Sequence, residues 1–152
     1  MGIRSEVVLV LPKKNYEELN NMYNSLNKEK IKEWYKEHTT SQEVLDIHYK
    51  EVDEITDDTL DYYKHFIDEK EVDEIDDNGE VVLVHWNSIK WYEDIYFEIR
   101  YLHSYLDKLD ENGIDYYLGE ICETGEITER QNWVTGVCDI VNIQQNFSFN
   151  YK

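Results

Sequence analysis

The sequence predicts a single α+β domain with a largely antiparallel sheet and helices packed mainly on one of its faces. Three observations predict this class. Apolar residues recur at helical spacing through residues 15–67, strand–turn–strand patterns occupy residues 71–86 and 116–133, and one long amphipathic segment separates them. No Gly-, Ser- or Pro-rich linker interrupts the chain, so we expect one acidic domain, residues 1–152.

The first two predicted elements are a strand and a helix. Glu6–Leu11 is nearly all apolar, which is typical of a strand buried on both faces, and Pro12 ends it. Asn15 followed by Glu18 has the spacing of a capping box and predicts the start of a helix. The residues expected on the inward stripe of this helix are Leu19, Met22, Tyr23 and Leu26.

Three further helices are predicted before residue 70. Lys28–His38 forms the first of them, and Thr40 with Glu43 repeats the capping pattern ahead of the next. The last starts at Thr56 or Asp57. The expected inward residues, helix by helix, are Ile31, Trp34 and Tyr35; Val44, Ile47 and His48; and Leu60, Tyr63, Phe66 and Ile67.

The apolar period changes after residue 70. Glu71–Ile75 alternates acidic and apolar residues, Asp76-Asp77-Asn78-Gly79 is a turn signal, and Val81–Trp86 is apolar, which together predict a β-hairpin. Apolar residues then keep a helical register over Tyr92–Leu109, and Asn112-Gly113 ends that helix.

A second hairpin is predicted after the long helix. Its strands are Tyr116–Cys122 and Glu126–Trp133, joined by a turn at Glu123-Thr124-Gly125. An alternating pattern that starts at Val137 and continues to Tyr151 indicates further strand.

Charge is the most informative feature of the composition. The formal charge is −19, and residues 51–80 carry fourteen acidic and two basic side chains, whereas residues 1–30 are near neutral. Such a field repels nucleic acid and anionic membranes and attracts basic surfaces. No apolar run is long enough to span a membrane, and two cysteines do not make a disulfide framework. We therefore expect a cytoplasmic protein that binds neither nucleic acid directly nor membranes.

The usual signatures of catalysis and cofactor binding are missing. None of the six glycines stands in a phosphate-binding loop, so no nucleotide cofactor is expected. Cys122 and Cys138 fall in predicted strands, where a structural thiol is the commoner outcome. The acidic turn around Gly79 fails as a calcium loop because His85 occupies the position of the bidentate glutamate, and no zinc spacing is present. We expect no catalytic residue and no metal.

The acidic segment is the candidate site. One interpretation is a surface that only keeps the protein soluble. The other is mimicry of a phosphate backbone, in which the carboxylates occupy the nucleic-acid-binding groove of a partner. Interleaved aromatic residues such as Tyr62, Tyr63, Phe66, Trp86 and Trp91 are candidate anchors, although helical spacing places most of them in the core. The predicted partner-binding residues are Asp53, Glu54, Asp57, Asp58, Asp61, Tyr62, Asp73, Glu74, Asp76 and Asp77.

Met1–Val8 contains Gly-Ile-Arg-Ser-Glu-Val, and the stretch Trp86–Tyr92 is followed later in the chain by Gly119-Glu120. Both stretches resemble a group of small, uncharacterised phage proteins that typically open with Gly-Tyr-Arg-Ser-Glu-Val, and Ile3 stands here in place of the usual tyrosine. The resemblance implies a phage or prophage origin and supplies no catalytic residues. By analogy it is similar in type to acidic anti-CRISPR and other host-takeover inhibitors.

These observations predict a phage-encoded inhibitor in the cytoplasm of an infected bacterium. Its partner would be a host nucleic-acid-binding protein, such as a nucleic-acid-handling or CRISPR-type defence protein, bound through the acidic face. Two alternatives stay open. One is a small carboxylate- or metal-dependent hydrolase that uses Glu120, Glu123, Glu126 and Glu129. The other is a self-associating phage structural or assembly protein; the sequence does not fix the oligomeric state.

Overall fold

The computed structural model describes residues 3–68, 70–74, 80–93, 95–132, 141–143 and 147–149. The chain divides into two compact units, which we describe separately. Unit 1 comprises residues 1–19 and 68–152, and unit 2 comprises residues 20–67. The boundary falls inside helix α1 (Lys13–Asn24), so the two units share one continuous helix.

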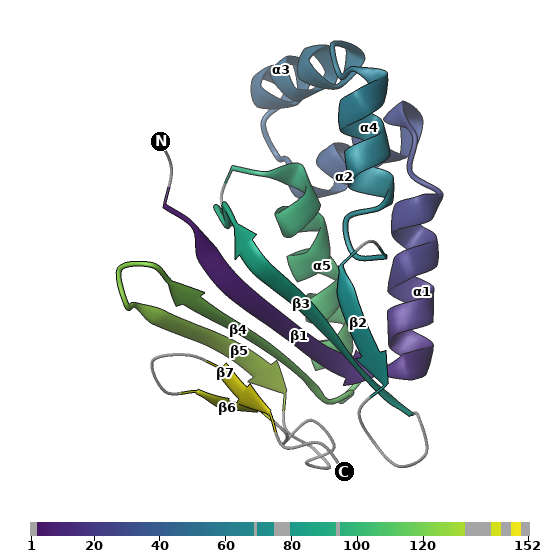
Figure 1. Ribbon diagram of the computed structural model, residues 1–152. Coiled ribbons are helices and arrows are strands. Elements are labelled where there is room, and N and C mark those ends of the chain that lie inside the picture. The colour runs from purple at the N-terminus through teal and green to yellow at the C-terminus, as the bar shows by residue number, and fades with distance from the viewer. Residues whose placement is uncertain are drawn as a thin grey trace. The chain divides into compact units, whose positions relative to one another are not determined.

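Unit 1 is built on a five-stranded antiparallel sheet in the order β2-β3-β1-β4-β5 (Figure 1). The strands are β1 (Ser5–Pro12), β2 (Glu71–Glu74), β3 (Val81–Ile89), β4 (Tyr116–Cys122) and β5 (Ile127–Asn132). Two short strands, β6 (Val141–Ile143) and β7 (Phe147–Phe149), pair antiparallel in a separate sheet. Both predicted hairpins are confirmed as β2–β3 and β4–β5, and the predicted turn at residues 76–79 falls outside the described ranges.

The central strand β1 is buried on both faces, as its apolar sequence predicts. All five residues from Val7 to Leu11 are fully buried, and Leu9 lies opposite Val84 of β3 and Leu118 of β4. Because strands β3 and β4 pair with its two edges, both polar edges of β1 are satisfied by backbone hydrogen bonds.

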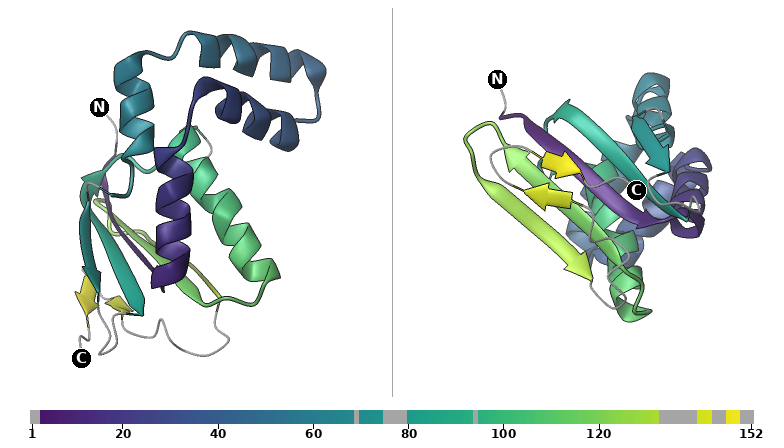
Figure 2. Two further views of the ribbon diagram at one scale, coloured as in Figure 1. Left: turned by 90° about the vertical axis from the view of Figure 1, so that its right-hand side faces the viewer. Right: turned by 60° about the horizontal axis from the view of Figure 1, so that its bottom comes forward.

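Helix α5 (Phe97–Glu111) and the unit-1 part of α1 lie against the same face of the sheet (Figure 2). The predicted α+β class with an antiparallel sheet is therefore confirmed. Helix α5 ends as the sequence predicts, because Gly113 has a φ of 64° and Ile114 N donates to Leu109 O. Its start is later than predicted, since Ile95 is exposed and precedes the helix.

The predicted capping role of Asn15 is wrong. Helix α1 begins directly after Pro12, where Lys13 N donates to Glu80 O, and Asn15 lies inside the first turn. Its side chain is buried, and Nδ2 donates to the hydroxyl of Tyr105 on α5, 3.2 Å away. That hydroxyl donates to Glu18, the residue expected to complete the capping box. The Asn and Glu of the sequence pattern thus join two helices.

Unit 2 contains the remainder of α1 and the helices α2 (Lys28–His38), α3 (Gln42–Asp53) and α4 (Asp57–Lys64). Helix α2 has the predicted bounds, and its buried residues are Ile31 and Trp34. The N-cap of α3 is Ser41 rather than Thr40, and Thr56 caps α4 as expected.

The predicted inward stripe of α3 is wrong. Leu45 and Val52 are its buried residues, whereas Val44 and Ile47 are exposed. His48 is only partly covered, and its ring stacks on Tyr35 of α2 with centroids 4.3 Å apart. The sequence offered apolar residues on two sides of this helix, and packing against α2 buries the other side.

Candidate functional site

The structure describes eight of the ten predicted partner-binding residues and places them in two groups. Six belong to unit 2, around the end of α3 and along α4: Asp53, Glu54, Asp57, Asp58, Asp61 and Tyr62. Asp73 and Glu74 are the last two residues of the edge strand β2 in unit 1, opposite Leu83 and Val82 of β3. Asp76 and Asp77 fall in the part of the chain that is not described. A single acidic face over residues 51–80 stays a prediction.

The five acids of unit 2, Asp53, Glu54, Asp57, Asp58 and Asp61, form what we call the acidic corner. It arises because α3 and α4 are separated by a very short link. Glu54 is the C-cap of α3, with its N–H donating to Lys50 O, and Thr56 accepts from Thr59 N to cap α4. Two helix ends rich in carboxylates are thereby brought to one place in unit 2 (Figure 1).

Two of these five carboxylates have partners among the described residues. Lys32 Nζ lies 2.5 Å from Asp53, and Asp61 lies 3.6 Å from His65. Glu54, Asp57 and Asp58 are exposed, and within the described ranges no cation or hydrogen-bond donor contacts their side-chain carboxylates. Their negative charge is therefore available to an external cation.

The position of Asp53 and Glu54 opposes helix stability. They stand at the C-terminus of α3, where the helix dipole disfavours negative charge. Lysines of α2 offset this for Asp53, since Lys28 donates to its carbonyl oxygen at 3.0 Å and Lys32 to its carboxylate. Asp57 and Asp58 stand in the first turn of α4, where the dipole favours them. Helix stability accounts for Asp57 and Asp58, and it does not account for Glu54.

Among the candidate aromatic anchors, Tyr62 is the exposed one. Its exposed fraction is 44%, whereas Phe66, Trp86 and Trp91 are buried and Tyr63 is intermediate. The ring of Tyr62 meets Phe66 edge-on, with centroids 6.0 Å apart, so the tyrosine is held against the core of unit 2 while one side stays accessible.

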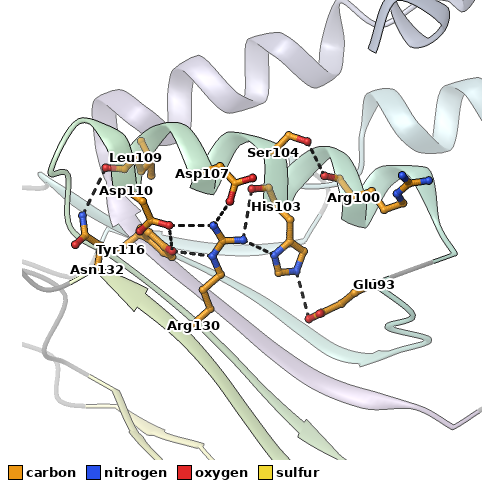
Figure 3. A network of polar contacts seen from close by, with 10 residues as sticks. All are labelled: Glu93, Arg100, His103, Ser104, Asp107, Leu109, Asp110, Tyr116, Arg130 and Asn132. Carbon is orange, nitrogen blue, oxygen red and sulfur yellow. Dashed lines mark hydrogen bonds and ion pairs between the residues drawn. The ribbon is translucent and has the colours of Figure 1, made fainter. Parts of the chain in front are cut away.

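A second polar cluster, which the sequence did not reveal, is centred on Arg130 of β5 in unit 1 (Figure 3). Its Nη2 contacts Asp107 and donates to Asp110 of α5 at 3.0 Å, and its Nε donates to the hydroxyl of Tyr116 of β4 at 2.8 Å. Its Nη1 lies 2.8 Å from Nδ1 of His103. One guanidinium thus joins α5 to two strands.

The protonation of His103 follows from this contact. Arginine only donates, so Nδ1 of His103 accepts and its proton resides on Nε2, 3.3 Å from a carboxylate oxygen of Glu93 (Figure 3). Burial lowers the pKa of His103, Glu93 raises it and Arg130 lowers it further, with a net decrease. Both ring nitrogens face other groups, and no Ser, Thr or Cys side chain contacts either nitrogen within the described ranges. We call this cluster (Arg130, His103, Asp107, Asp110 and Tyr116) the Arg130 clamp, because it links α5 to β4 and β5.

The four carboxylates of the hydrolase alternative lie along the β4–β5 hairpin, and three of them have separate hydrogen-bond donors. Glu120 accepts from the hydroxyl of Ser5, Glu123 from Arg4 N at 3.1 Å, and Glu129 from the hydroxyl of Tyr117 at 2.9 Å. Burial raises the pKa of Glu120, and Glu93 and Glu126 raise it further against the effect of Ser5. Glu120 also lines an open cleft of about 320 Å³ with Trp91, Tyr92, Glu93, Ile95 and Thr128.

Comparisons with known proteins give no assignment. No family model, no curated protein and no solved structure matches the chain. Within the described residues, no helix is both long and apolar enough to cross a bilayer. In the same part of the chain, no group of three or more His, Cys, Asp or Glu side chains could hold a metal ion.

Proposed function

We propose that this protein is a non-enzymatic inhibitor that binds the nucleic-acid-binding surface of a basic partner protein through the acidic corner. The observation that carries the proposal is the set of three exposed carboxylates, Glu54, Asp57 and Asp58, at the meeting point of two helices, which no cation contacts within the part of the chain that the structure describes. Carboxylates held on a folded scaffold attract the same lysines and arginines that contact phosphates.

The local charge supports this role. Between Gln42 and Asp61 the chain has eight acidic side chains and one basic one. Charges this close to one another reinforce their field, and this field speeds the approach of a basic surface. Tyr62 adds an accessible aromatic ring beside the acids, a residue type enriched in binding hot spots.

The phage origin in the proposal rests on the resemblance of Met1–Val8 and Trp86–Tyr92 to small phage proteins. It makes a host nucleic-acid-handling or defence protein the expected partner, in the cytoplasm of an infected bacterium. The inhibitor would act stoichiometrically, by occupying the groove that otherwise binds DNA or RNA.

The hydrolase alternative has one observation in its favour. Glu120 combines a raised pKa with a place in an open cleft beside Glu93, an arrangement in which one acid could protonate and the other act as a base. Glu120→Gln would abolish any such activity and leave binding of a basic partner unchanged.

Affinity capture from nuclease-treated bacterial lysate tests the proposal. The wild type is compared with a variant in which Glu54, Asp57 and Asp58 are changed to Lys, and with a control in which Glu17, Glu111 and Glu126 are changed to Lys. Both triple variants change the net charge equally, and all six positions are exposed. We expect a nucleic-acid-binding protein to be retained at low salt by the wild type and the control, and lost from the acidic-corner variant. Equal retention by all three proteins would refute the proposal.

A further inference from the structure

Helix α3 has an exposed apolar pair on the side away from the core of unit 2. The exposed fractions of Val44 and Ile47 are 43% and 56%, and the pair is three residues apart, so both side chains lie on one face of the helix. The buried residues of α3, Leu45 and Val52, lie on another face. A solvated helix face normally carries polar residues, and β-branched residues such as Val44 and Ile47 have a lower helix propensity than unbranched ones.

Three carboxylates lie around Ile47 on this face. Glu51 follows Ile47 by four residues, Glu54 follows it by seven, and Glu43 precedes it by four, so each lies one or two helical turns from the isoleucine. All three are exposed. Glu51 lies 3.6 Å from His48, and no cation contacts Glu43 or Glu54 among the described residues. Lys50, which is exposed and follows Ile47 by three residues, is a cation on the same face. The face is therefore an apolar centre whose rim carries three glutamates and one lysine, with a net negative charge.

The charge of the rim decides what can cover the centre. A second copy of this chain would bring its own acids against these acids, and each copy carries a formal charge of −19. A lipid surface with anionic headgroups would be repelled in the same way. A segment with an apolar stripe and flanking Lys or Arg satisfies both the centre and the rim.

We propose that the α3 face (Val44, Ile47, Glu43, Glu51 and Glu54) is a docking surface for a basic amphipathic helix of the partner protein. The inference rests on the proposed function and adds an apolar contact to the binding surface, which the acidic corner provides mainly through charge. The apolar stripe of the partner helix packs on Val44 and Ile47, and its basic side chains pair with the three glutamates. Burial of Val44 and Ile47 excludes water and makes binding specific. The glutamates speed association and fix the orientation of the partner helix on α3.

The test uses a defined probe. A lysine- and leucine-containing peptide of about 18 residues, long enough to form a helix, carries leucines at i, i+3, i+4 and i+7. A second peptide keeps every lysine and has serine at the leucine positions. Affinities for the full chain are measured by fluorescence anisotropy, and methyl NMR locates the contact on the protein. The variants are Val44→Ser with Ile47→Ser, and, as a matched control, Ile95→Ser with Ile127→Ser, two exposed isoleucines of unit 1.

We expect the leucine peptide to bind more tightly than the serine peptide and to shift the methyl signals of Val44 and Ile47. The Val44/Ile47 variant should lose roughly tenfold in affinity for the leucine peptide, and the control variant should not. Equal affinity of the Val44/Ile47 variant and the wild type overturns the inference. Self-association of the wild type that the variant abolishes also overturns it, because the occupant is then a second copy.

The proposed function has a separate outcome in the same assay. Suppose that reversal of Glu54, Asp57 and Asp58 to Lys abolishes binding of both peptides, while the Val44/Ile47 variant binds as the wild type does. The docking inference is then wrong, and the proposed binding through the acidic corner is supported. If neither the Val44/Ile47 variant nor the charge-reversal variant changes either affinity, both fail.

Discussion

Nη1 of Arg130 donates a hydrogen bond of 2.8 Å to Nδ1 of His103, and this bond joins strand β5 to helix α5. The same guanidinium contacts Asp107, Asp110 and Tyr116, so four side chains share one cation. A single surface ion pair contributes little to the free energy of folding. A half-buried guanidinium with several partners contributes more, because its removal leaves all of those partners without their cation or donor.

Replacement of Arg130 by Met should lower the free energy of unfolding by about 1–3 kcal/mol, because it leaves two aspartates beside each other without their cation. Arg130→Lys should recover only part of this, since lysine cannot donate to Tyr116, His103 and the aspartates at once. Urea unfolding measures both effects. Lys108→Met, an exposed change of equal charge on the same helix, is the control, and an equal loss there would contradict the clamp.

His103 should titrate below its ordinary pKa in the folded protein, because burial disfavours the imidazolium. The unfolded state then binds more protons than the folded state between the two pKa values, so the contribution of His103 to stability is lost as the pH falls below about 6.5. An NMR titration of the His103 ring checks this directly. A pKa above that of a histidine in an unfolded peptide would contradict the neutral, Nε2-protonated state.

Glu98 gives a pH dependence of opposite sign. It is buried in the first turn of α5, and burial raises its pKa to about 7. A raised carboxyl pKa means that the folded state binds the extra proton, so stability is lost as the pH rises from about 4.5 through 7. Glu98→Gln should therefore stabilise the protein by about 1–3 kcal/mol at pH 8 and by little at pH 4. Thermal unfolding at both pH values, beside the exposed control Glu111→Gln, measures this; a gain equal at both values would disprove it.

Gly119 should not tolerate a side chain. A Cβ at this position would clash with the hydroxyl of Tyr117 and approach its Cε2 to 2.7 Å, because the tyrosine ring lies over the glycine to reach Glu129. Gly119→Ala should cost about 1–3 kcal/mol. In a Tyr117→Leu background the shorter side chain leaves room, so the same change should cost less. Additive losses in the double variant would show that the two residues do not interact.

Much of the fold follows from the sequence because the pattern is local. Neighbouring residues alone predict several elements. The spacing of apolar residues predicts the helix Lys28–His38, Gly113 and Gly125 mark a helix end and a turn, and a run of apolar residues predicts β1. The predictions for Asn15 and for the Val44–Ile47 stripe are wrong because two interpretations fit the local sequence, and tertiary contacts with α5 and α2 decide between them.

Of the candidate site too, the parts that depend on local sequence could be predicted, and the parts that depend on long-range packing could not. Clustering of Asp53 to Asp61 follows from their closeness in sequence, and exposure of Tyr62 follows from helical spacing, which places Tyr63 and not Tyr62 on the inward stripe. The Arg130 clamp gives no sequence signal, because His103, Asp107 and Arg130 meet only through the register of β4 with β5 and the packing of α5. That register is set by long-range pairing, which no local spacing encodes.

If the acidic corner competes with nucleic acid for a basic partner, this protein should displace a labelled oligonucleotide from the captured partner. The wild type should release the oligonucleotide stoichiometrically, and its direct binding to the partner should weaken as salt rises from about 50 to about 200 mM. The Glu54, Asp57, Asp58→Lys variant should release none, and the Glu17, Glu111, Glu126→Lys control should behave as the wild type. A partner that binds the wild type and nucleic acid together, or equal displacement by the acidic-corner variant, would contradict it.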